Sequence, residues 1–135
     1  MSSFQELEHT ADWAFRVRGR DLKELFANAV RGLASLEGWE ASDSTSNLVQ
    51  EIEVSGYDQE TLLVNWLNEL LYRREKERAS FGPIEILELS DTHLKARVHS
   101  RANGDSLRKI KSVTFNRLQI EQRSEGWEAI ITVDV

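Results

Sequence analysis

The sequence predicts an α+β fold in a single domain, with a mostly antiparallel or mixed β-sheet and two amphipathic helices packed on one face. Two segments carry apolar residues at helical spacing, and most other segments alternate apolar and polar residues as strands do. The predicted order is strand, helix, strand, helix and then four or five strands, which favours α+β over an alternating α/β fold. A length of 135 residues without a repeat or linker fits one domain over residues 1–135.

The first predicted helix begins after Asp21 and ends at Gly38. Asp21 is the expected N-cap, and Glu24 can complete a capping box with it. The second helix runs from near Asp58 to about Arg78, with an acidic start and basic later turns that suit the helix dipole. The apolar stripe of the first helix is Leu22, Leu25, Phe26, Ala29, Val30, Leu33 and Leu36, and that of the second is Leu62, Leu63, Trp66, Leu67, Leu70 and Leu71.

The other segments predict strands joined by short turns. Residues 84–89 are expected to pair with residues 94–99 across Ser90 and Asp91, and Gly126 lies in the turn before the last strand. Residues 40–47 combine Ser, Asp, Thr and Asn, which indicates a surface loop. The predicted strands are a short N-terminal strand and residues 13–18, 48–55, 84–89, 94–99, 109–115, 118–121 and 127–135.

The composition excludes several classes of site and partner. With 17 basic and 23 acidic residues, the net charge of −6 gives little general attraction for nucleic acid or anionic membranes. The chain has no cysteine, which excludes disulfides, thiolate nucleophiles and cysteine-ligated zinc. No apolar run approaches the roughly 20 residues that span a bilayer, so we expect a cytoplasmic protein without a membrane partner.

Glu8, His9 and Asp12 lie within five positions, between two predicted strands. Such side chains can bind a cation or move a proton. His9 and Asp12 equally fit a turn in which they cap local backbone donors. Calcium or magnesium needs oxygen ligands from several parts of a chain, so this segment alone is an incomplete metal site.

The last predicted strand places Asp134 beside the main-chain carboxylate of Val135. Two anions held close together repel each other, and a bound cation relieves that repulsion. The alternative is that both carboxylates point into water. The C-terminus is therefore a second incomplete acidic feature.

A basic patch accompanies the predicted strand at residues 109–115. Lys109 and Lys111 share one side of this strand with Val113 and Phe115, and Arg101 and Arg108 add to the charge. Lysines commonly protect an edge strand from pairing. The alternative is a docking surface for an acidic partner or RNA.

The sequence lacks a glycine-rich phosphate loop, a His-Glu-x-x-His pair and a serine in a nucleophile-elbow context. His93 and His99 fall on the polar face of their strand, where isolated histidines are poor signs of catalysis. A metal-dependent hydrolase would have only Glu8 or His9 as a nearby general base. These absences disfavour a self-sufficient enzyme.

The chain resembles the archease family in four blocks that follow each other along its whole length. They are HTAD at residues 9–12 with RGRDLKELFANA at 18–29, LLVNWLNELLY at 62–72, IKSVTF at 110–115, and GWEA at 126–129 with the final Asp134 and Val135. Family members often have aspartate in place of Asn65 and Tyr-His in place of Phe115 and Asn116. These departures concern the expected partner surface rather than the expected metal ligands.

The resemblance implies an accessory protein that is not an enzyme. Archeases assist the GTP-dependent RNA ligase that joins tRNA exon halves and repairs RNA, by promoting guanylylation of the ligase's active-site histidine and repeated turnover. The family's metal site corresponds here to Asp12, Asp134 and Val135 through its carboxylate. The expected ion is divalent, with calcium first and magnesium or manganese as alternatives.

Two further expectations concern partners. The protein partner is the tRNA-splicing RNA ligase, with no strong direct binding of nucleic acid and a monomeric or weakly oligomeric chain. The alternative function is a general chaperone-like protein-interaction module in RNA processing without metal dependence, which could use the broad face around Trp66. A core role for such a helical stripe is the more usual one.

Overall fold

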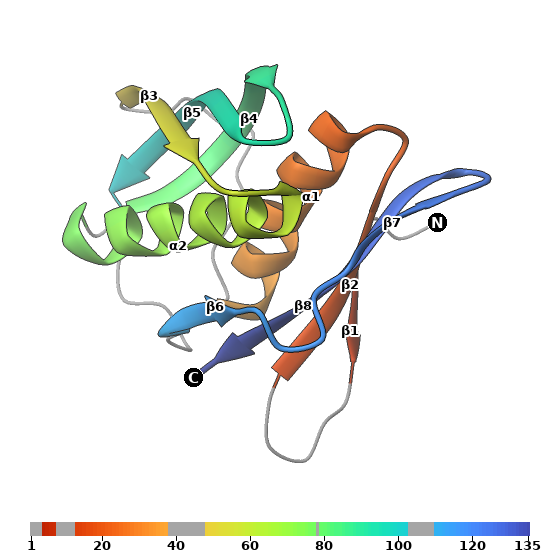
Figure 1. Cartoon of the computed structure of the whole chain (residues 1–135). Coiled ribbons are helices and arrows are strands. Elements are labelled where there is room, and N and C mark those ends of the chain that lie inside the picture. Colours follow the sequence, from red (N-terminus) through yellow and green to blue (C-terminus); the bar gives the residue numbers. More distant parts are fainter. Residues whose placement is uncertain (1–3, 8–12, 38–47, 78, 103–109) are drawn as a thin grey trace.

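The structure is a computed structural model of the chain, and it describes residues 4–7, 13–37, 48–77, 79–102 and 110–135 (Figure 1). Eight strands and two helices are found in this part of the chain. In order they are β1 (Phe4–Leu7), β2 (Trp13–Gly19), α1 (Leu22–Glu37), β3 (Leu48–Ser55), α2 (Gln59–Glu77), β4 (Ala79–Leu89), β5 (His93–Ala102), β6 (Ser112–Thr114), β7 (Ile120–Arg123) and β8 (Gly126–Asp134).

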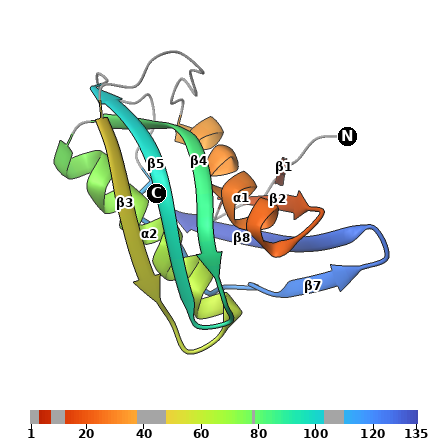
Figure 2. The same cartoon turned by 90° about the horizontal axis from the view of Figure 1, so that it is seen from above.

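The strands form two antiparallel sheets rather than one. One sheet has the order β1-β2-β8-β6 with β7 also paired to β8, and the other has the order β3-β5-β4. Helix α1 contacts β1, β2 and β8 of the first sheet and β4 of the second, while α2 contacts β3, β4 and β5 as well as β6. The helices therefore lie between the two sheets and cover one face of each (Figures 1 and 2). This arrangement confirms the α+β class.

The buried apolar residues of both helices and both sheets form one core cluster. Trp66 lies at the contact between the helices, and its indole Nε1–H donates to the carbonyl oxygen of Phe26 at 3.1 Å. All six apolar residues predicted for the stripe of α2 are buried. The face around Trp66 is therefore core, as its helical spacing favours.

Both helices begin where the sequence predicts. The backbone N–H of Glu24 donates to Asp21 Oδ1 at 2.8 Å, and Glu24 Oε1 accepts from the N–H of Arg20 at 3.0 Å. The capping side chain of α2 is Asp58, whose Oδ1 accepts from the N–H of Thr61 at 2.8 Å. These bonds satisfy N–H groups that have no partner within the helix. Gly38, Arg78 and the predicted loop at residues 40–47 lie outside the described residues.

Most predicted strands are confirmed, including β3 with the predicted bounds and the β4–β5 hairpin, in which Leu89 pairs with Leu94. Strand β4 begins at Ala79, five residues before the predicted start at Ile84. Pro83 lies inside it and accompanies a shift in register between Phe81 and Ile84. The edge position of β4 tolerates a residue without an N–H donor. Neither helix in the described part of the chain is long and apolar enough to cross a membrane.

Candidate metal centre

The C-terminal strand presents its last two residues to solvent while its body is buried. Ala129, Ile131 and Val133 belong to the core cluster, as the period of two predicts for one face of a strand. Asp134 follows Val133 and is exposed, and Val135 is 46% exposed. A rigid strand therefore carries the Asp134 carboxylate at the surface of the protein.

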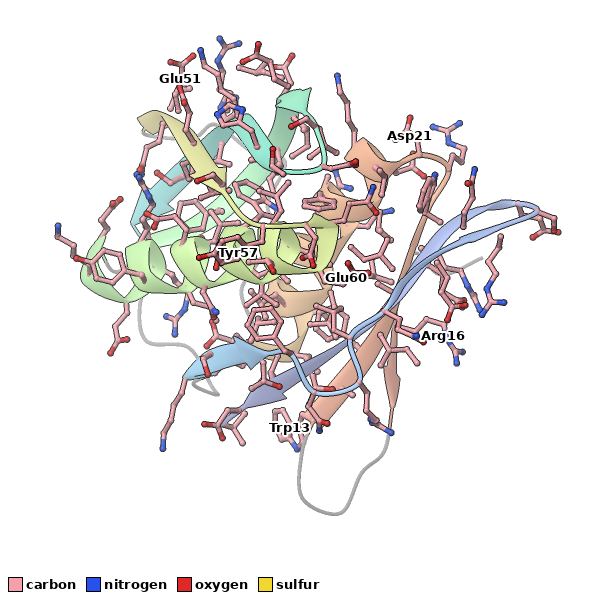
Figure 3. The ribbon with its side chains drawn as sticks, in the orientation of Figure 1. Trp13, Arg16, Asp21, Glu51, Tyr57 and Glu60 are labelled. Atoms are coloured by element: carbon pink, nitrogen blue, oxygen red, sulfur yellow. The ribbon has the colours of Figure 1, made fainter. Side chains whose placement is uncertain are left out.

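Strand β2 is the direct neighbour of β8, and its first residue, Trp13, pairs with Val133. Figure 3 shows Trp13 at the same end of the sheet as the end of β8. Of the predicted ligands, Asp12 precedes Trp13 in the sequence and lies outside the described residues, as do Glu8 and His9. The structure thus brings the strand that follows the N-terminal acidic segment beside the strand that carries Asp134.

Strand β6 flanks β8 on its other side. Ser112 pairs with Asp134, and the backbone N–H of Lys111 also donates to the carbonyl oxygen of Asp134 at 2.7 Å. Lys111 and Ser112 thus both lie opposite Asp134 of β8, and two residues opposite one is the arrangement of a β-bulge. The backbone of Asp134 is therefore held by the β6 side, while the described pairing of β8 with β2 ends at Val133.

This bulge corrects the predicted alternation of residues 109–115. Lys111 is exposed whereas Val113 is buried, although both were expected on one side of a continuous strand. The regular strand has only three residues, Ser112–Thr114, because Ile110 is buried before the bulge and a turn follows at Phe115. Of the predicted basic patch, Arg108 and Lys109 lie outside the described residues, and so does the side chain of Arg101.

The donors at this end of the sheet fit a hard cation. The Asp134 carboxylate, the main-chain carboxylate of Val135 and the hydroxyl of the neighbouring Ser112 are all oxygen ligands, which calcium and magnesium prefer. Within the described ranges, no group of three or more His, Cys, Asp and Glu side chains lies together. A complete site therefore needs at least one further oxygen ligand, and the expected one is Asp12.

The opposite end of β8 has a different character. A pocket of about 520 Å³ lies between the end of β2, the start of α1 and the β7–β8 hairpin. Several of its charged side chains pair with one another: Arg18 Nε donates to Glu128 Oε1 at 2.9 Å, and the Arg20 guanidinium lies 3.0 Å from Glu24 Oε2. Hydrogen bonds from Arg20 also lower the pKa of Glu24. The positive charges of the arginines that line this pocket are therefore balanced by neighbouring glutamates.

The predicted surface histidines are found as expected. His93 and His99 are half-buried on the polar face of β5, and His93 Nε2 lies 3.2 Å from Glu53 Oε2. The pair is a contact between the neighbouring strands β5 and β3 on the outer face of the β3-β5-β4 sheet. It lies on the other sheet from Asp134.

The predicted site residues do not include Asn68, whose carboxamide bonds to the backbone of β6. Of the two asparagines that depart from the family pattern, Asn65 donates to the Ser55 carbonyl oxygen at 2.7 Å, and Asn116 follows β6 in an exposed turn. The available signal was position: Asn68 stands between buried Leu67 and Leu70 on α2. Asparagine is a poor helix former, so its place at the border of a buried stripe indicates a tertiary hydrogen bond.

Relatives of the chain are found along its whole described length. A sequence model of the archease protein family matches residues 4–135. The archease of Methanosarcina acetivorans is 32% identical over 142 residues, covering 98% of this chain and 95% of that protein. The archease of Archaeoglobus fulgidus is 31% identical over 140 residues and is covered to 98%, as is this chain.

Two solved structures share the fold. The solution structure of Methanobacterium thermoautotrophicum protein 1598 superposes with a TM-score of 0.79 at 26% identity, with complete coverage of both chains. The crystal structure of a Thermotoga maritima archease, described as a possible chaperone, gives a TM-score of 0.70 at 21% identity and covers 96% of this chain and 94% of that one. The similarity to the Thermotoga protein concerns the fold alone.

Proposed function

Because this chain belongs to the archease family, we propose that it is a non-catalytic accessory protein that activates an RNA ligase in tRNA splicing and RNA repair. It docks transiently on the ligase, promotes guanylylation of the ligase's active-site histidine by GTP and so permits multiple turnovers. The partner is a protein, and the chain itself makes no strong contact with the RNA. An acidic net charge of −6 supports that last point.

The observation that carries the proposal is the pairing of Trp13 with Val133. Residues paired in an antiparallel ladder have Cα atoms about 4.5–5.5 Å apart, and the Cα atoms of neighbouring residues in the chain are about 3.8 Å apart. The covalent chain therefore keeps Asp12 close to Trp13, and Asp134 close to Val133. Two acidic features that are incomplete by themselves can thus contribute to one site.

In the proposed site, Asp12, Asp134 and the carboxylate of Val135 hold a divalent cation. Calcium suits this donor set best, since it accepts six to eight oxygen ligands in flexible geometry, and magnesium or manganese are the alternatives. A cation bound there supplies positive charge that offsets phosphate charge during nucleotidyl transfer in the partner's active site. The chain's own part is to hold its carboxylates at an exposed strand end, where a partner can reach them.

Guanylylation of the cognate ligase, measured with GTP in the presence and absence of this chain, tests the proposal. We expect the chain to raise both the rate of covalent ligase–GMP formation and the number of turnovers. Asp134→Ala should reduce the stimulation, whereas Asp91→Ala, at another exposed aspartate in the β4–β5 turn that accepts from Gln59, should leave it unchanged. A ligase that is guanylylated equally well without the chain contradicts the proposal.

The second candidate is a chaperone-like module in RNA processing without metal dependence. The Thermotoga maritima archease, whose fold this chain shares, is described as a possible chaperone. The broad apolar face of α2 does not support it, because that face is buried in the core. Suppression of the aggregation of an unfolded client protein, unaffected by chelator, would distinguish this function from ligase activation.

A further inference from the structure

The side chain of Asn68 forms two hydrogen bonds with the backbone of β6, on the edge of this strand that faces away from β8. The Val113 N–H donates to Asn68 Oδ1 at 2.7 Å, and Asn68 Nδ2 donates to the Val113 carbonyl oxygen at 3.2 Å. A carboxamide has the same donor and acceptor as a peptide group, so it satisfies both backbone groups that Val113 turns away from β8. One side chain of α2 thereby closes an edge that would otherwise remain unpaired.

Strand β6 in turn holds the end of β8. Its three residues pair with Thr132, Val133 and Asp134, and Lys111 adds a second bond to the Asp134 carbonyl oxygen. A three-residue strand makes few ladder bonds and is weak by itself. The order of the Asp134 backbone therefore depends on what fixes β6 from its far side.

Two other carboxylates fix the main chain on either side of β6. Glu37 Oε2 accepts from the Ile110 N–H at 2.7 Å, and Glu60 Oε2 accepts from the Ile120 N–H at 3.1 Å. Figure 3 shows Glu60 on α2 where the helix approaches the segment leading to β7. Asn68 lies between these two anchors and is the one that bonds to β6 itself. Its contact is therefore the most direct link from the helices to Asp134.

We propose that Asn68 is a positioning residue for the cation site: through Val113 it fixes β6, and through β6 it fixes the carboxylates of Asp134 and Val135. This inference rests on the proposed function, because it assigns a role in the same site. Residues that orient metal ligands from outside the ligand set typically contribute about 10-fold or more to metal affinity. Asn68 would do so through the backbone rather than by touching a ligand side chain.

Calcium titration by calorimetry on the full chain, with Asn68→Ala, tests this role. Alanine is the better helix former, so α2 itself does not lose helical propensity. We expect about 10-fold weaker calcium binding, together with faster hydrogen exchange at the Val113 and Asp134 amides. Asn65→Ala is the matched control, since it removes a hydrogen bond of 2.7 Å from the same helix to β3, in the other sheet. Its calcium affinity should equal that of the wild type.

A second variant separates positioning from general loss of stability. Asn68→Asp keeps the acceptor for the Val113 N–H but loses the donor, so hydrogen exchange at the Val113 amide should lie between those of the wild type and Asn68→Ala, and its calcium affinity should remain below that of the wild type. Equal calcium affinity in the wild type and both Asn68 variants overturns the positioning role and leaves the proposed function intact. A wild-type chain that binds no calcium, magnesium or manganese instead contradicts the cation site, and with it both proposals.

Discussion

Glu37 and Arg74 form a two-point ion pair that joins the C-terminal ends of the two helices. Arg74 Nε lies 2.6 Å from Glu37 Oε1, and Arg74 Nη2 donates to Glu37 Oε2 at 3.0 Å. The Glu37 side chain is fully buried, and its Oε2 also accepts from the Ile110 N–H. One buried carboxylate thus connects α1, α2 and the segment that leads into β6.

Arg74→Ala should destabilise the fold strongly, because it leaves the Glu37 carboxylate buried without its cation. Breaking a buried pair from one side costs about 3–5 kcal/mol of unfolding free energy. Urea denaturation followed by tryptophan fluorescence measures this loss. Arg20→Ala removes the exposed pair with Glu24 instead, and it should cost far less, because solvent-exposed ion pairs contribute little to stability. An equal loss of unfolding free energy in the two variants would show that the buried Glu37–Arg74 pair stabilises the fold no more than an exposed pair does.

The cap of α2 gives an acid-dependent contribution to stability. A hydrogen bond from the Thr61 backbone lowers the pKa of Asp58 below its ordinary value. A lowered pKa in the folded state means that the contribution is complete above the unfolded-state pKa, about 3.9, and is lost as the pH falls through the folded-state pKa. Asp58→Asn keeps a good capping side chain and removes only this titration.

The difference in unfolding free energy between the wild type and Asp58→Asn should therefore be constant near neutral pH and should shrink below about pH 4. Urea titrations at a series of pH values measure it. A difference that grows on acidification would contradict the direction of the Asp58 pKa shift. The same reasoning applies to Glu24, whose pKa is lowered by hydrogen bonds from Arg20.

Gly126 at the start of β8 cannot be replaced without strain. Its φ of +141° is a conformation that only glycine adopts readily, and a Cβ there would overlap the carbonyl oxygen of Gly19 on β2. Backbone strain and overpacking together predict a loss of about 2–4 kcal/mol for Gly126→Ala. Chemical denaturation measures the loss, with Ser124→Ala in the same hairpin as the control. A Gly126→Ala protein as stable as the control would refute the close approach of the β7–β8 turn to β2.

Local patterns predicted the parts of the fold that local forces determine. The capping box of Asp21 and Glu24 and the buried stripe around Trp66 follow from helical spacing, so the helices were predicted closely. The division of the strands into two sheets depends on contacts between residues far apart in the sequence, which periodicity does not record. The segment that leads into β6 differs most, because the Ile110 N–H bonds to Glu37 and the Lys111 N–H bonds to the Asp134 carbonyl oxygen, and these tertiary bonds interrupt its alternation.

In the candidate site, too, local patterns predicted some features, and contacts between distant residues determine the others. The exposed position of Asp134 follows from the alternation of the last strand, and the resemblance to archeases pairs it with Asp12. No pattern in the sequence indicates that β6 pairs with the backbone of Asp134 or that Asn68 forms hydrogen bonds with β6. Both contacts join residues far apart in the sequence and involve backbone groups, whose partners cannot be identified from residue types alone.

Extension of the chain by one glycine after Val135 tests the main-chain carboxylate as a ligand. The extra residue moves that carboxylate by about 3.8 Å while keeping its charge. Calcium affinity should then fall without a change in unfolding free energy, because the end of β8 is exposed and contributes little to the core. Calorimetric titration measures the affinity, and thermal unfolding in chelator measures the stability.

Terbium gives an independent readout of the same site, since it replaces calcium and its luminescence is sensitised by a nearby indole. Trp13 pairs with Val133, so terbium bound at this end of the sheet should be sensitised in the wild type and much less in Trp13→Phe. The glycine extension should reduce the terbium signal at a given concentration, whereas Asp91→Ala should not. If the extended chain binds calcium and terbium as the wild type does, the main-chain carboxylate of Val135 is not a ligand, and other oxygen atoms must hold the cation.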